Sequence, residues 1–197
     1  MAEKAKKSGR KRRKMTVERL NNIALYYCQR YLVSERKLSD HLKNRVYRDT
    51  EDGEDRRKIL EEIPVIAARM ARAGLVNDRE AASARLRSNL RSGYAPGAAA
   101  GLAAMAARVE RETVEDVLPE AMTDTFPDIT EEAGEDAPDG AALALAALER
   151  GRRGPFRGNK RTEKTDQRDV AWLQRRGYRF DDIRKAMNVD GEEYFDG

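Results

Sequence analysis

The chain has 197 residues, of which 38% are charged and only 6% are aromatic, and its formal net charge is +4. This composition favours solvent-exposed amphipathic helices over a thick core containing a β-sheet. No window approaches the roughly 18 apolar residues that a membrane span needs, and a single cysteine, Cys28, excludes an internal disulfide. We therefore expect an all-α protein of the cytoplasm that does not contact a membrane.

The charges are unevenly distributed along the chain. The opening sequence AEKAKKSGRKRRK holds one acid among its lysines and arginines, residues 123–140 contain acids and no base, and residues 150–164 are again basic. Because the opening run cannot bury enough apolar surface to offset the entropy of ordering, it is expected to form a disordered basic arm. The acidic segment contains Pro and Gly without a regular period, which predicts a loop.

The first half of the chain predicts helices with recognisable starts. Thr16 and Ser34 each precede apolar residues at helical spacing and are expected N-caps. The sequence TEDGED at residues 50–55 predicts a polar connector. A helical pattern then continues up to Gly74, and Pro64 inside it predicts either a kink or a helix start.

The second half of the chain also predicts short helices separated by polar turns. The basic helix before Ser92 has Leu86 and Leu90 on its buried face, and Gly151 is expected to end a later helix. Further helix starts are expected at Asn77 or Asp78, Pro96, Thr113, Asp139, Asp166 and Asp181.

One local pattern, Arg-x-Gly-(Leu/Tyr), occurs three times, at residues 72–75, 91–94 and 175–178. Each glycine is an expected helix-ending residue, and the apolar residue after it can fold back onto the ended helix in a Schellman motif. The pattern predicts an elongated array of three tandem three-helix, helix-turn-helix-like repeats that share a core. The expected parts are a basic arm 1–15, repeats 16–73 and 74–122, an acidic loop 123–140, a third repeat 141–190 and an acidic tail 191–197.

Three segments resemble the RecX regulatory proteins of bacteria. The start, RLNNIALYYCQRYLVSERKLSDHL, is similar to the family's Ala-Leu-x-Tyr-Leu element and the Ser-capped Leu-x-x-x-Leu helix after it. The middle, GLVNDREAASARLRSNLRSGYAP, resembles Gly-Tyr-(Leu/Val)-Asp-Asp, a basic helix and Arg-x-Gly-Tyr-x-Pro. Near the end, RDVAWLQRRGYRFDDIRKAM resembles the terminal Leu-x-x-Arg-Gly-(Phe/Tyr) element with its Ile-x-x-Ala continuation.

This resemblance implies a modular array of three-helix repeats that contacts the RecA recombinase. Such proteins restrain growth of the RecA filament and reduce its ATPase, strand-exchange and co-protease activities, which places them in DNA recombination, repair and the SOS response. The sequence departs from the family pattern at the helix after Pro96, GAAAGLAAMAAR, which carries far less charge than usual. We expect a monomer that binds the RecA filament and contacts single- or double-stranded DNA weakly.

A modulator of a nucleoprotein filament must meet acidic protein patches and phosphates, so basic side chains are the candidate contacts. One group lies on the basic helix before Gly93, and the other lies in the basic segment around Phe156. The candidate binding residues are Arg87, Arg91, Arg152, Arg153, Arg157, Lys160 and Arg161.

Enzymatic chemistry has little support in the sequence. His41 is the only histidine and no nucleophile–base pattern accompanies it, so a helix-face role is expected. One Cys and one His cannot supply a Cys/His metal site, and no GxxxxGK(S/T) motif is present. We expect no catalytic residue, metal or cofactor. Two alternatives remain open: a nonspecific helix-turn-helix-like DNA-binding protein, and a helical adaptor for another protein.

Overall fold

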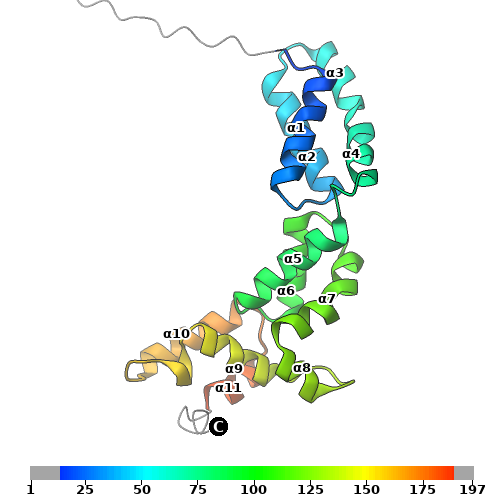
Figure 1. Cartoon of the computed structure of the whole chain (residues 1–197). Coiled ribbons are helices and arrows are strands. Elements are labelled where there is room, and N and C mark those ends of the chain that lie inside the picture. Colours follow the sequence, from blue (N-terminus) through cyan, green and yellow to red (C-terminus); the bar gives the residue numbers. More distant parts are fainter. Residues whose placement is uncertain (1–13, 189–197) are drawn as a thin grey trace, which may run out of the picture. The chain divides into compact units, whose positions relative to one another are not determined.

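The computed structural model describes residues 14–188, and within this range every regular element is a helix (Figure 1). The expected all-α fold is thereby confirmed. The chain divides into two compact units, Met1–Asn77 and Asp78–Gly197. The expected acidic tail and most of the expected basic arm lie outside the described residues. No helix in residues 14–188 combines the length and apolar character that a bilayer crossing requires.

The first unit packs α1, α2 and α4 around one core, with α3 against α2 and α4. Its helices are α1 (Val17–Arg30), α2 (Glu35–Asp49), α3 (Gly53–Glu61) and α4 (Ile63–Arg72). Thr16 and Ser34 cap α1 and α2 as expected, each accepting a hydrogen bond from the amide three residues on. The largest buried side chains are Leu20, Val33, Leu38, Leu42, Val46, Ile63 and Ile66.

Two expectations for the first unit need correction, and an alternative left open at Pro64 is decided. Met15 was expected in the disordered arm, but it is only 2% exposed. Its apolar side chain directly follows the basic run and packs into the hydrophobic core of the first unit. The expected connector 50–55 contains the start of α3, since Asp52 caps the Asp55 amide at 2.8 Å. Of the two outcomes expected at Pro64, the helix start is confirmed: α3 ends at Glu61 and α4 begins at Ile63, with Pro64 in its first turn.

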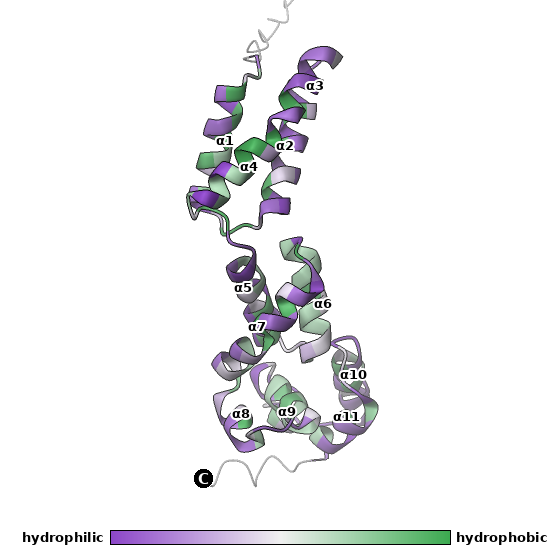
Figure 2. Ribbon diagram, turned by 90° about the vertical axis from the view of Figure 1, so that its right-hand side faces the viewer, coloured by the Kyte–Doolittle hydropathy of each residue, from purple (hydrophilic) through white to green (hydrophobic). Residues whose placement is uncertain are grey.

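The second unit contains two groups of packed helices. The first group is α5 (Asp78–Arg91), α6 (Pro96–Ala107) and α7 (Arg111–Thr125), with α8 (Pro127–Ala133) against α7. The second group is α9 (Gly140–Arg150), the 3-10 turn η1 (Gly154–Phe156), α10 (Glu163–Gln174) and α11 (Phe180–Met187). Figure 2 shows α6 in the hydrophobic colours over most of its length, and its buried residues are the alanines 99, 100, 103 and 107.

Several boundaries in the second unit differ from expectation. The expected acidic loop 123–140 holds the end of α7 and all of α8, because Phe126, only 4% exposed, anchors this segment in the core. Thr113 caps no helix and lies inside α7. The helix expected from Asp166 begins at Glu163, where a Thr162–Thr165 capping box satisfies the first amides, and the helix expected from Asp181 begins at Phe180. Asp139 caps α9 as expected.

Candidate functional site

The three Arg-x-Gly-(Leu/Tyr) segments are helix ends, as the sequence predicts. Gly74, Gly93 and Gly177 all have positive φ, between 70° and 87°. In each, the glycine amide donates to the carbonyl three residues back, and the next amide donates to the carbonyl five residues back, as Tyr94 N does to Asn89 O at 3.2 Å. This is the Schellman hydrogen-bond pattern.

Two of these turns, around Gly93 and Gly177, contact each other within the second unit. The Ala95 amide donates to the Arg176 carbonyl at 2.9 Å, and Arg176 Nε donates to the Ser92 carbonyl at 3.2 Å. A Cβ on Gly177 would lie 2.7 Å from the Ala98 Cβ, so glycine is required there for the close approach as well as for the positive φ. The repeated pattern therefore joins the two helix groups of this unit.

Stacked side chains complete this joint. The Arg176 guanidinium lies over the Trp172 ring at 3.8 Å from its centroid and over the Tyr94 ring at 5.0 Å. Arg153 covers Trp172 as well, at 4.8 Å. The Tyr178 hydroxyl, buried beyond the joint, donates to the Leu143 carbonyl of α9 at 3.2 Å, and burial raises the pKa of Tyr178 above its ordinary range. Tyr94 and Tyr178 are thus packing residues.

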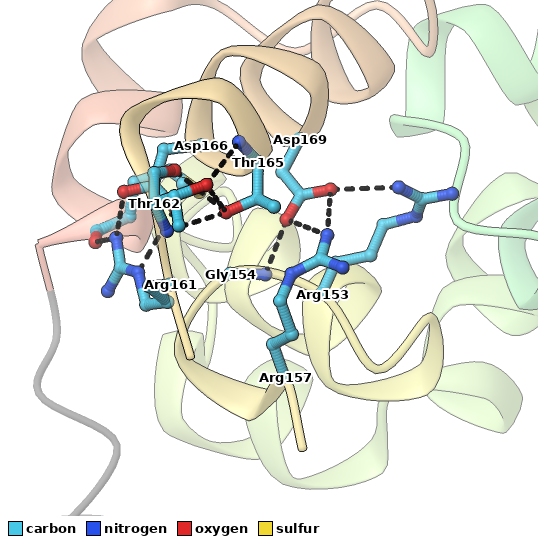
Figure 3. A network of polar contacts seen from close by, with 9 residues as sticks. Arg153, Gly154, Arg157, Arg161, Thr162, Thr165, Asp166 and Asp169 are labelled. Atoms are coloured by element: carbon cyan, nitrogen blue, oxygen red, sulfur yellow. Dashed lines mark hydrogen bonds and ion pairs between the residues drawn. The ribbon is translucent and has the colours of Figure 1, made fainter. Parts of the chain in front are cut away.

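The Asp169 side chain on α10 forms ion pairs with two of the candidate binding residues, Arg153 and Arg157 (Figure 3). Its side chain is 0% exposed and accepts hydrogen bonds from Arg153 Nη1 at 2.8 Å, from Arg157 Nη2 at 2.7 Å and from the Gly154 amide at 2.9 Å. Burial alone raises the pKa of Asp169, but these hydrogen bonds outweigh it and hold the pKa below its ordinary value. Arg153 and Arg157 therefore stabilise the fold through a buried carboxylate.

The other five candidates are divided between structural and exposed positions. Arg161 pairs with Asp166 at 3.2 Å and donates to the Met187 carbonyl at 2.9 Å, which ties the loop to α10 and α11. Arg87 pairs with Asp124 at 2.7 Å and with Glu120 at 3.2 Å, which ties α5 to α7. Arg91, Arg152 and Lys160 are exposed. The seven residues thus do not form one open basic patch.

A different basic and aromatic surface lies in the first unit, on α1 and α2. Among the described residues it is a groove of ≈ 750 Å³, and the nine residues that line it include three arginines and no carboxylate. The lining residues are Arg19, Asn22, Ile23, Tyr26, Tyr27, Arg30, Tyr31, His41 and Arg45. We call this surface the α1–α2 groove.

The rings of the groove are arranged side by side. Tyr27 stacks on His41 with centroids 3.8 Å apart and planes 5° apart, and it lies 5.1 Å from Tyr31. Burial and the nearby charges of Arg45 and Arg48 lower the pKa of His41, so the imidazole is neutral at pH 7. The helix-face role expected for His41 has a specific form here, which is to hold Tyr27 from α2.

Polar groups at the two ends of the groove fix its arginines. Arg30 Nη1 donates to the Tyr26 hydroxyl at 2.6 Å, and its guanidinium lies 5.5 Å from that ring centroid. At the other end Arg45 pairs with Asp49 at 2.9 Å, and Arg19 reaches the same carboxylate at 3.7 Å. Burial raises the pKa of Asp49, but Arg45 and Arg48 outweigh that effect and lower it overall.

Cys28 is half-buried against the hydrophobic core of the first unit. Burial raises the pKa of its thiol, which favours the protonated, unreactive form. Among residues 14–188, no group of three His, Cys, Asp or Glu side chains could hold a metal ion.

No protein-family model and no curated protein matches this chain.

Proposed function

We propose that this protein is a non-enzymatic regulator that binds the RecA nucleoprotein filament, inhibits its growth and lowers its ATPase, strand-exchange and co-protease activities. The observation that carries the proposal is the joint between the Gly93 and Gly177 turns, because both turns belong to the segments that resemble RecX proteins. The motif residues have a physical role there that suits a modular helical array. The protein is proposed to act as a monomer in the cytoplasm.

The proposed array consists of three tandem three-helix repeats. The helix trios would be α1, α2 and α4; α5, α6 and α7; and α9, α10 and α11, with α3 and α8 as additions to the first and second. Trios that each contact a different RecA subunit would gain affinity through multivalency, because the second and third contacts form at a high effective concentration.

Of the seven candidates, Arg91, Arg152 and Lys160 are the exposed ones, and they are proposed to contact the filament. The other four candidates stabilise the fold of the second unit through ion pairs; they are Arg87, Arg153, Arg157 and Arg161. Each phosphate contact would release counterions, so binding through the exposed cations is expected to weaken as salt rises.

The test is the ATPase activity of RecA on single-stranded DNA, with this protein added in substoichiometric amounts. Inhibition well below one molecule per RecA is the expected result, because a regulator of filament growth acts on many subunits at once. The Arg91→Gln, Arg152→Gln, Lys160→Gln variant is expected to inhibit less, with an unchanged circular dichroism spectrum. No inhibition at excess, with ordinary binding to bare DNA, would refute the proposal.

A charge-matched control separates specific contacts from net charge. Lys43, Arg57 and Arg72 are exposed cations of the first unit. Neutralising these three to Gln changes the net charge by the same amount, so the control variant should inhibit RecA better than the Arg91, Arg152, Lys160 variant. Equal loss in both variants would mean that only overall charge matters.

A further inference from the structure

The α1–α2 groove concentrates ring systems in a chain that has few of them. The sequence holds seven tyrosines and one histidine, and three of those tyrosines and the histidine line this one groove. Tyr26 and Tyr31 are 59% and 53% exposed, so large parts of two rings face solvent. Exposed rings that are clustered along one groove, rather than scattered singly, are typical of a ligand-binding surface.

The charge of the groove has one sign along its lining. Arg19, Arg30 and Arg45 come from both helices, and Asp49, which pairs with Arg45 and Arg19, lies at one end. Arg30, at the other end, contacts the Tyr26 hydroxyl and ring. A ligand that suits this surface therefore carries flat groups that stack on the rings and anionic groups that lie beside the arginines.

We propose that the α1–α2 groove binds single-stranded nucleic acid, with bases stacked on Tyr26 and Tyr31 and phosphates beside Arg30 and Arg19. Stacking on aromatic side chains together with a basic track is the usual recognition mode for single strands, and it tolerates any base sequence. The volume of ≈ 750 Å³ suits a ligand of nucleotide size. The inference does not depend on RecA.

Other polyanions fit the groove less well. In a duplex the faces of the bases are covered by their neighbours, so Tyr26 and Tyr31 could reach only the backbone. An acidic peptide would pair with the arginines but would offer no ring for the tyrosines. The stacking pair Tyr27–His41 also supports this choice, because it holds one ring of the set in a fixed orientation beside Tyr31.

The test is fluorescence anisotropy of a labelled oligothymidine of about 20 nucleotides, long enough for one site, with the full-length protein at moderate salt. The double variant Tyr26→Ala, Tyr31→Ala is expected to bind about tenfold more weakly or worse, because each stacked base is lost. The double variant Tyr26→Phe, Tyr31→Phe keeps both rings and should bind like the wild type. The comparison between variants cancels the contribution of the basic sequence at residues 2–14.

Tyr47 provides a matched control. It is 59% exposed, as Tyr26 is, and an arginine, Arg56, lies 5.5 Å from its ring centroid, as Arg30 lies from Tyr26. Tyr47 does not line the groove, so Tyr47→Ala should leave oligothymidine affinity unchanged. Circular dichroism of all variants checks that the helices remain folded.

Arg30→Gln tests the phosphate contact against Arg57→Gln, a change at an exposed arginine of α3. Loss of one phosphate contact should lower the slope of log affinity against log salt by about 0.7 for Arg30→Gln, whereas Arg57→Gln should retain the wild-type slope. The proposal is overturned by wild-type affinity in the Tyr26→Ala, Tyr31→Ala variant, or by equal loss in Tyr47→Ala. It is also overturned if a duplex of equal length, or polyglutamate of equal charge, competes as well as the single strand.

Discussion

The α1–α2 groove and the loop between α9 and α10 both combine arginines with aromatic rings, yet they differ in where the charge is neutralised. In the loop, the Asp169 carboxylate pairs with both Arg153 and Arg157. Arg153 also lies over the Trp172 ring. In the groove, no carboxylate is among the lining residues, and Asp49 pairs with Arg45 and Arg19 at one end only. An arginine is thus a candidate ligand contact where it lies beside an exposed ring, as Arg30 does beside Tyr26, and a structural residue where a buried carboxylate pairs with it, as Asp169 does with Arg153.

The largest effect is expected for Asp169→Ala, which leaves two half-buried guanidiniums without their carboxylate. We expect the second unit to lose about 3–5 kcal/mol of unfolding free energy, the usual cost of removing one partner of a buried ion pair. Trp172, the one tryptophan of the sequence, reports this unfolding by fluorescence in urea. Asp166→Ala, one turn earlier and paired at a more exposed position, should cost at most about 1 kcal/mol; equal losses would contradict the role of Asp169.

A smaller effect is expected for Gly177→Ala at the joint. Alanine meets a positive φ of 87° and places its Cβ 2.7 Å from that of Ala98, so a loss of about 2–3 kcal/mol is expected from the two costs together. Gly74 has a φ of 70° but open space around it, so Gly74→Ala should cost only about 1 kcal/mol. Urea unfolding followed by circular dichroism measures both, and the reverse order would argue against a close contact at the joint.

The pH dependence should differ between wild type and Asp169→Asn. The pKa of Asp169 is lowered in the folded protein, whereas an unfolded Asp has a pKa of about 3.9. The carboxylate therefore contributes stability above about pH 4 and loses it as pH falls through the lower folded pKa. Urea unfolding monitored at Trp172 over this range should show a steeper loss in wild type, and parallel curves would mean that Asp169 is not linked to stability.

The smallest effect, a gain, is expected for Arg152→Gly. Arg152 lies just beyond the end of α9 with a φ of 49°, and the Arg153 amide donates to the Leu148 carbonyl at 2.9 Å, so arginine occupies the position that glycine has at the other turns. Glycine should relieve about 0.5–1 kcal/mol of backbone strain. Arg152→Ala keeps the strain and should leave thermal stability unchanged; a similar gain in both variants would trace the effect to charge instead.

Helix ends were predictable where one side chain determines them. Thr16, Ser34 and Asp139 cap helices by local hydrogen bonds, and three glycines end them by their own positive φ. In contrast, α8 was missed because distant contacts hold it. Arg150 donates to the Thr125 carbonyl at 2.6 Å and covers the Phe126 ring at 4.5 Å, and neither contact leaves a local pattern in an acidic segment.

The roles of the basic residues were harder to predict than the fold. Arg153 and Arg157 lie 16 and 12 residues before Asp169, so no local rule pairs them. One signal was available: Asp169 precedes the buried Leu173 by four residues and therefore lies on the same face of its helix. The α1–α2 groove leaves no local signal of this kind, because its ring contact between Tyr27 and His41 joins two different helices.

The buried hydroxyl of Tyr178 has a spectroscopic consequence. Burial keeps this phenol protonated above the pH at which an ordinary phenol ionises, because it raises the pKa of Tyr178, and the hydrogen bond that the hydroxyl donates to the Leu143 carbonyl needs the protonated form. In an alkaline titration followed by the ultraviolet absorbance of phenolate, Tyr178 should ionise only when the second unit opens. A late step in that titration, absent in Tyr178→Phe, would then measure how tightly the two helix groups are held together.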